Sequence, residues 1–278
     1  MAFSNPGFSQ SPAFSKNGGP VIRQQQAAAQ QPVAFDGMTA EQLQDLYSKP
    51  AAGPDQTDRM TYEDTITKTL MAFGVVVVFA AIGWFVPALA FVGAIAGFVL
   101  ALVNIFKKKP SPALVLAYSA AQGLFVGGIS AIFEAQWDGI VTQALLGTIS
   151  VFVVTLLLFK SGKVRESARA TKIFMIAMIG YAVFSLLNVV LMLTGANSNP
   201  WGLRGAEIFG IPIGFLLGIL VVLMAAYSLV LDFTNVKTGV ERGAPRIYGW
   251  SAAFGIVMTV IWLYVEILRM LAILRGNN

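Results

Sequence analysis

The chain has 278 residues, of which 56% are hydrophobic and only 12% are charged, and its formal net charge is +5. Soluble domains carry about 25% charged residues, so this composition indicates a membrane protein. Cysteine and histidine are both absent. Their absence excludes disulfides, thiolate nucleophiles, histidine-based catalytic triads and the usual zinc sites. We therefore expect no enzyme, and any proton sensing would have to rely on carboxylates.

Residues 1–58 are polar and low in sequence complexity. A Pro- and Phe-containing segment at 5–10 is echoed at 11–16, and a Gln/Ala-rich tract covers 24–31. This composition cannot bury enough apolar surface to fold, so it predicts a disordered tail with a short helix at 40–47. The repeated Phe motif could dock onto a partner membrane protein, and plain disorder is the alternative.

Seven apolar runs follow in residues 59–278, which we expect to form one transmembrane domain. Each run is near the ~20 residues that cross a hydrocarbon core. Each run must be helical, because backbone polar groups surrounded by lipid need partners within their own segment. The runs cover residues 69–86, 88–106, 113–133, 139–159, 173–194, 208–231 and 252–274. The predicted fold class is therefore an all-α, polytopic membrane protein with seven transmembrane helices.

Basic residues gather in alternate connections between these runs. They are Lys107, Lys108, Lys109, Lys160, Lys163, Arg165, Arg169, Lys172, Lys237, Arg242 and Arg246, whereas the opposite connections hold only Arg204. We expect the protein to lie in the cell inner (plasma) membrane. The positive-inside rule then places the first set of connections, and with it the N-terminus, on the cytoplasmic side. If the last helix spans the membrane, the C-terminus lies outside, and Arg269 and Arg275 near that end then go against the rule. A re-entrant last segment, which would return them to the cytoplasm, is the alternative.

Glycines recur four residues apart within several runs, at Gly93 and Gly97, at Gly123 and Gly127, and at Gly210, Gly214 and Gly218. Small residues at this spacing let membrane helices approach closely. Tight packing is the favoured interpretation, and a mobile helix seam is the alternative. Pro212 in the sixth run is expected to kink that helix.

Two carboxylates are the strongest functional candidates. Glu266 has apolar sequence on both sides, and Asp232 closes the preceding apolar run. Acids inside a bilayer are costly, and they usually mark an ion or proton path. As a pair they could share a proton or provide oxygen ligands to Ca²⁺, with backbone carbonyls or water completing the site. Arg269 lies three residues after Glu266 on the same helix face, so a local ion pair is the alternative interpretation.

The remaining polar residues point to packing or solvation. Asn104, Gln122 and Asn188 are expected to form hydrogen bonds between helices. Glu134 and Asp138 are expected to be solvated in a short external loop. Motifs for phosphate, dinucleotide or nucleic-acid binding are absent, and so is a metalloprotease helix. We expect no cofactor, with Ca²⁺ entering only as a transported ion.

The segment 229–274 resembles the C-terminal signature of the Bax inhibitor family, also called the transmembrane Bax inhibitor motif family. An Asp-Thr-Gln-like element is read here as Asp232-Phe233-Thr234. A Leu-Tyr-Leu-Asp-like element is read as Leu263-Tyr264-Val265-Glu266. The segments 242–245, 250–269 and 60–64 are similar to a bacterial branch of the family, the actinobacterial one. By architecture the resemblance covers about residues 59 to 276.

The resemblance implies a seven-helix bundle with a central last helix surrounded by the other six. It also implies a pH-sensitive Ca²⁺ leak through a buried di-aspartyl pair, which carries over to Asp232 and Glu266. This chain departs from the family pattern in three ways: the second acid is Glu, the stretch between the acids is longer, and the second helix lacks a basic latch residue. Some bacterial relatives are described instead as non-transporting regulatory partners of a membrane protease or stress complex, which is the alternative function. A proton-coupled transporter is a third, weaker option.

Overall fold

A computed structural model describes residues 58–276, apart from 197, 198 and 200. Within that part of the chain, seven helices are long and apolar enough to cross a membrane, which confirms the predicted all-α, polytopic fold. They are α4 (Tyr62–Phe85), α5 (Leu89–Phe106), α6 (Pro112–Gln136), α7 (Ile140–Lys160), α8 (Ala168–Leu193), α9 (Ile213–Glu241) and α10 (Gly249–Gly276). The expected helix at 40–47 and the Phe repeats lie outside the described residues.

Local sequence explains where several helices begin. The Thr61 side chain accepts a hydrogen bond of 3.1 Å from the Asp64 backbone N–H, and Glu63 and Asp64 place negative charge in the first turn of α4. Ser167 caps α8 in the same way, at 3.2 Å from the Ala170 backbone N–H. These side chains satisfy backbone N–H groups that have no partner within the helix.

The start of α9 differs from the prediction. The polar backbone before it forms a 3-10 turn, η2 (Gly202–Gly205), and a short antiparallel hairpin of β1 (Glu207–Ile208) and β2 (Ile211–Pro212). Pro212 immediately precedes α9, so the expected kink is wrong. A proline fits a helix start because it has no N–H to leave unpaired. Gly210 has a φ of +76° and belongs to the hairpin turn rather than to a helix seam.

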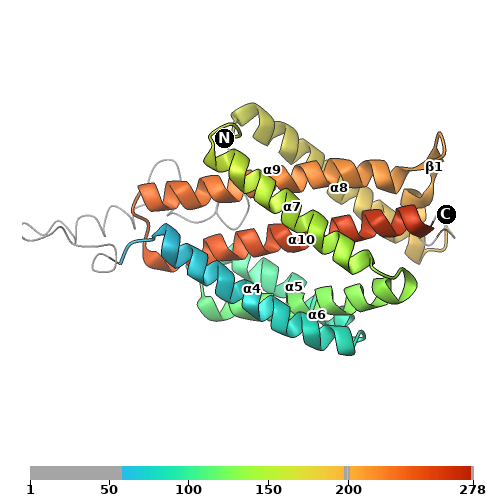
Figure 1. Cartoon of the computed structure of the whole chain (residues 1–278), viewed down its shortest axis with the longest axis horizontal. Helices are drawn as coiled ribbons and strands as arrows, with labels where there is room; N and C mark the ends of the chain where they lie inside the picture. Colours follow the sequence, from blue (N-terminus) through green and yellow to red (C-terminus); the bar gives the residue numbers. More distant parts are fainter. Residues whose placement is uncertain (1–57, 197–198, 200, 277–278) are drawn as a thin grey trace, which may run out of the picture.

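Helix α10 occupies the centre of the bundle, as the family resemblance implied (Figure 1). It packs directly against α4, α6, α7 and α9, and it has the largest buried share of the seven spans. Helix α5 packs against α6, and α8 lies at the periphery with little of its span buried. Residues on α10 are therefore the ones most completely shielded from lipid.

Glycines allow α4, α5 and α6 to approach one another closely. A Cβ at Gly127 would lie 1.9 Å from the Ala80 carbonyl oxygen, and one at Gly123 would lie 2.5 Å from that of Val76. A Cβ at Gly93 would lie 2.6 Å from the carbonyl oxygen of Ala121. Backbone atoms cannot move aside as flexible side chains do, so these glycines serve close packing.

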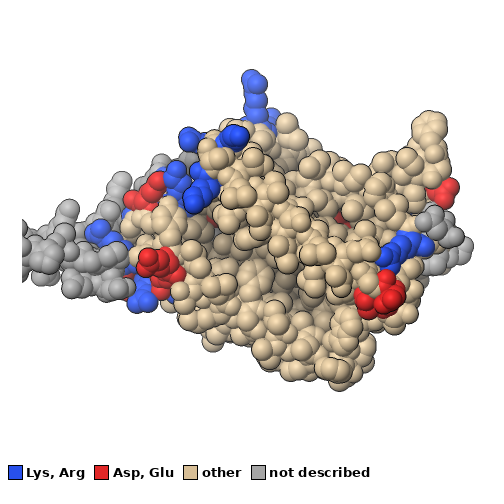
Figure 2. Space-filling view, viewed as in Figure 1, with Lys and Arg blue, Asp and Glu red and all other residues tan. Residues whose placement is uncertain are grey.

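Helix α10 continues without a break from one end of the bundle to the other (Figure 1). Its C-terminal end lies near the β1 hairpin, opposite the end where α4 begins. The last segment therefore spans the bundle and is not re-entrant. Figure 2 shows that most visible Lys and Arg side chains gather at the end where α4 begins, which we call the lysine-rich end. The cytoplasmic location of that end remains a prediction.

Candidate functional site

Glu266 is buried in α10 with 1% of its surface exposed, and three polar groups surround its carboxylate. The Tyr181 hydroxyl donates a hydrogen bond of 2.9 Å to Oε2. The Arg269 guanidinium forms an ion pair with the same oxygen, and Nη1 of Arg204 lies 3.7 Å from Oε1. The structure therefore contains the local pair with Arg269 that was the alternative interpretation, and it adds a second arginine.

Arg204 comes from η2, in the connection between α8 and α9, and is only 4% exposed. Its Nη2 donates hydrogen bonds to Ser185 Oγ at 2.9 Å and to the Tyr181 hydroxyl at 3.3 Å. Its guanidinium carbon also lies 5.4 Å from the Tyr181 ring and 5.6 Å from the Phe184 ring. These contacts with α8 direct a loop residue into the interior of the bundle.

Asn188 holds the loop in this position. Its Oδ1 accepts a hydrogen bond of 2.6 Å from the Leu203 backbone N–H, and its Nδ2 donates to the Trp201 carbonyl at 3.4 Å. Asn188 was expected to form a hydrogen bond between two transmembrane helices. It instead bonds α8 to the η2 connection. An amide within an apolar run, followed by a polar connection, is the pattern in the sequence that could have indicated this contact.

Tyr181 links all the charged groups of this site. Its hydroxyl accepts a hydrogen bond of 2.6 Å from Arg269 Nη2 while it donates to Glu266. Two guanidinium groups and one carboxylate give this cluster a formal excess of one positive charge. Among the described residues, Arg204 Nη1 and Arg269 Nε have no hydrogen-bond acceptor. Because both oxygens of Glu266 already face guanidinium groups, a cation that binds Glu266 would have to compete with Arg204 and Arg269.

Asp232 lies fully buried in α9 and contacts α10 at a different level. The Thr259 hydroxyl donates a hydrogen bond of 2.7 Å to Asp232 Oδ2, and the Ser228 and Thr259 hydroxyl oxygens are 3.3 Å apart. Thr259 and Glu266 are seven residues apart on α10, or about 10 Å along the helix axis. The structure therefore gives the two acids separate partners, two turns apart, and does not bring them together in one cluster.

A ready-made metal site is not visible in the part of the chain that the structure describes. No group of three or more acidic side chains converges there in a way that could hold a metal ion. Two separate carboxylates would need backbone carbonyls or water to complete the ligands that Ca²⁺ requires. The tentative assignment of Asp232 and Glu266 as Ca²⁺ ligands thus remains a prediction.

Two further residues position α10 and the loop before α7. The Tyr264 hydroxyl oxygen lies 2.6 Å from Ser130 Oγ, which joins α10 to α6 inside the bundle.

Glu134 is partly buried and is not the solvated side chain expected from sequence. Its carboxylate accepts hydrogen bonds from the backbone N–H groups of Gly139 at 2.7 Å and Val141 at 2.9 Å, and so caps α7.

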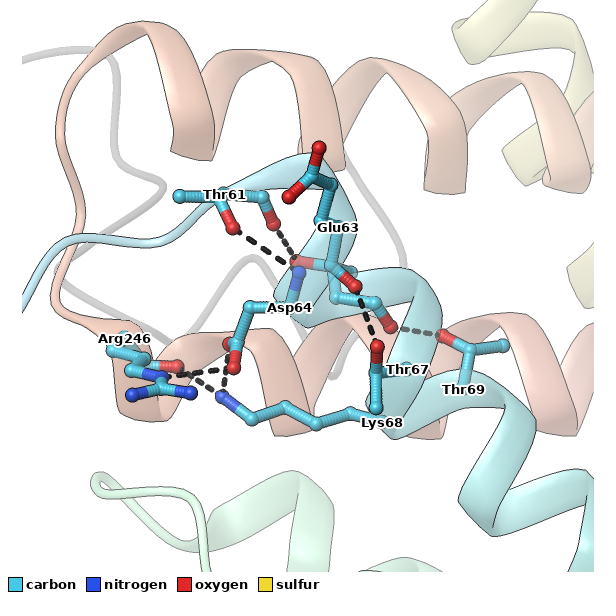
Figure 3. A network of polar contacts seen from close by, with 8 residues as sticks. Thr61, Glu63, Asp64, Thr67, Lys68, Thr69 and Arg246 are labelled. Atoms are coloured by element: carbon cyan, nitrogen blue, oxygen red, sulfur yellow. Dashed lines mark hydrogen bonds and ion pairs between the residues drawn. The ribbon is translucent and has the colours of Figure 1, made fainter. Parts of the chain in front are cut away.

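A second polar cluster lies at the lysine-rich end (Figure 3). The Lys68 ammonium, whose side chain is 9% exposed, contacts the Asp64 carboxylate and donates to the Arg246 carbonyl at 2.6 Å. Arg246 Nε donates to Asp64 Oδ1 at 2.8 Å. Nearby, the Met60 backbone N–H donates to the Ala244 carbonyl at 2.7 Å. These bonds fasten the start of α4 to the connection between α9 and α10.

The fold and the buried charges define a multi-pass membrane protein with ionisable groups inside its helix bundle. The family model described as Bax inhibitor 1 like matches residues 5–276. The chain therefore belongs to the Bax inhibitor 1 like family, as its C-terminal motifs predicted. The match also includes most of the N-terminal segment, which the resemblance by architecture had left out. No curated protein matches this chain.

Proposed function

We propose that this protein lets Ca²⁺ or another cation cross the membrane slowly, in a pH-sensitive manner. The observation that carries the proposal is a pair of buried carboxylates: Glu266 lies on the central helix α10, and Asp232 on α9 contacts α10 two turns away, at Thr259. Ionisable groups inside membrane bundles are rare and are associated with ion or proton pathways. The separation of the two acids supports a path with two successive sites rather than one shared cluster.

Each acid has its own role in this proposal. Asp232 lies at the level of Thr259, nearer the lysine-rich end, and would control entry from that side. Glu266 lies two turns further along α10 and would be the deeper cation or proton site. Carboxylate oxygens suit a hard cation, and the hydroxyls of Ser228 and Thr259 supply further oxygen atoms beside Asp232.

The arrangement around Glu266 supports a closed resting conformation. The guanidinium groups of Arg204 and Arg269 occupy the positions that a cation would need. Arg269 shares α10 with Glu266, whereas Arg204 is carried by a different element, the η2 connection. Release of Arg204 would open the site. Protonation of the two acids would weaken cation binding and alter the contacts between helices, which gives the proposed path a route to pH sensitivity.

Reconstitution into liposomes that contain a Ca²⁺ dye tests the proposal. We expect Asp232→Asn and Glu266→Gln each to reduce Ca²⁺ flux and to flatten its dependence on pH. Glu241→Gln is the matched control, because this acid lies on α9 with its side chain 60% exposed. A dye for internal pH, read in parallel, distinguishes protons from Ca²⁺. Unchanged flux in both buried-acid variants would refute the proposal.

The alternative role as a regulatory partner of a membrane protease or stress complex rests on the N-terminal segment. That segment lies outside the described residues, so this role stays a prediction, as does the absence of enzymatic activity. If the purified chain captures such a complex but passes no ion in liposomes, the alternative is the better account.

A further inference from the structure

An apolar groove of about 450 Å³ lies between α4 and α7, with α9 and α10 behind it. In Figure 1, α4 and α7 run on either side of α10. Phe233 of α9 lies at the back of the groove. Its ring centroid is 5.8 Å from that of Phe152 and 5.6 Å from that of Phe159, both on α7. Three aromatic rings thus shape a lateral hollow in the membrane-spanning region.

The chemistry of the groove selects a hydrocarbon ligand. Two of its few polar groups are the hydroxyls of Thr65 and Thr69, and these already donate to helix carbonyl oxygens at 2.7 and 2.8 Å. The groove therefore offers little to water or to an ion. Its edge residues Ile66 and Leu70 are 57% and 65% exposed on the outer surface of a membrane-spanning helix. Acyl chains are the apolar molecules that surround the protein at this depth.

Charged residues that follow groove-lining residues in the sequence indicate which lipid fits. Lys160 directly follows the groove-lining Phe159, and Lys237 directly follows the groove-lining Val236. Both lysines are exposed, and the ion pair of Lys237 with Glu241 is loose, at 3.7 Å with both side chains at least half exposed. Tyr62, in the first turn of α4, also lines the groove, and tyrosine is typical of the membrane–water interface.

We propose that this groove binds one phospholipid with an anionic headgroup from the leaflet at the lysine-rich end. One acyl chain lies against Phe152, Phe159 and Phe233, and the headgroup phosphate lies near Lys160 and Lys237. The length of a lysine side chain lets its ammonium reach the headgroup while its methylene groups cover apolar surface. Basic side chains near a membrane surface attract anionic lipids in this way.

Native mass spectrometry of the purified full-length protein tests the site. The protein is incubated in detergent with phosphatidylglycerol and phosphatidylcholine that carry identical acyl chains. We expect one retained lipid, with phosphatidylglycerol preferred. Thr69→Phe fills the groove and should reduce retention by roughly tenfold, which corresponds to the loss of about two buried methylene contacts. Val78→Phe places the same ring on the outer face of α4 and should retain the lipid.

The headgroup contact has its own pair of variants. Lys160→Gln with Lys237→Gln should remove the preference for phosphatidylglycerol, whereas Lys108→Gln with Lys109→Gln, in another connection at the same end, should preserve it. Equal lipid retention by Thr69→Phe and Val78→Phe would show unspecific annular lipid and would overturn the proposal. If the wild-type protein forms dimers, and Thr69→Phe removes the dimers but not the lipid, the groove binds a second copy of the chain. That result would equally overturn the lipid proposal.

Discussion

At the scale of single residues, the arginines around Glu266 explain how the bundle tolerates a buried acid. Glu266 was predictable from its apolar surroundings, and Arg269 from its spacing along the same helix. Arg204 was not predictable as part of this site, because a basic residue in a short connection normally lies in solvent. The contacts that draw Arg204 inward come from Tyr181 and Ser185 on α8. Residues that meet only through tertiary packing leave no periodic signal in the sequence.

The formal charges in this cluster predict unequal effects on stability. Glu266→Gln leaves one buried and one partly buried guanidinium group without their carboxylate, and it should destabilise the fold by about 3–5 kcal/mol. Arg204→Gln leaves a balanced pair of Glu266 and Arg269, and it should cost only about 1–3 kcal/mol. Thermal unfolding of the two variants in the same detergent measures the order. If Arg204→Gln lowered the melting temperature as much as Glu266→Gln, or more, the formal charges would not explain the stability of this cluster.

At the scale of secondary-structure elements, the seven helices were predictable because lipid forces long apolar segments to be helical. The boundaries of α9 were not. Its apolar run includes residues of the β1–β2 hairpin, where backbone groups pair outside any helix, and the helix itself continues through polar residues to Glu241. Hydropathy reports the depth of a residue in the membrane, whereas capping and turn geometry decide where a helix begins or ends.

Close helix packing predicts opposite effects for two glycine substitutions. Gly127→Ala should destabilise the protein by about 1–3 kcal/mol, because its Cβ would overlap the Ala80 backbone on α4. Gly180→Ala is the matched control on α8, where no atom lies within 4 Å of the new Cβ. This control should be neutral or stabilising by up to about 1 kcal/mol, since alanine favours helix. Similar melting temperatures for the two variants would argue against a tight α4–α6 contact.

At the scale of the whole molecule, the charge distribution predicts the orientation in the membrane. The chain contains no cysteine, so single cysteines can report on accessibility without background. Lys163→Cys, at the lysine-rich end, should react with an impermeant maleimide only after the cells are permeabilised. Phe209→Cys, at the fully exposed tip of the hairpin, should react in intact cells. The reverse labelling pattern would invert the proposed topology.

If Glu266 is a cation site that Arg204 keeps closed, two substitutions should change Ca²⁺ flux through reconstituted liposomes in opposite directions. Arg204→Gln frees one side of the Glu266 carboxylate, so we expect faster Ca²⁺ flux than in the wild-type protein. Glu266→Gln removes the carboxylate itself, so the account predicts slower flux. Changes of opposite sign would support a site blocked by its own arginine. Wild-type flux in both variants would show that the cluster serves only to hold the helices together, and faster flux in Glu266→Gln would contradict a cation site at Glu266.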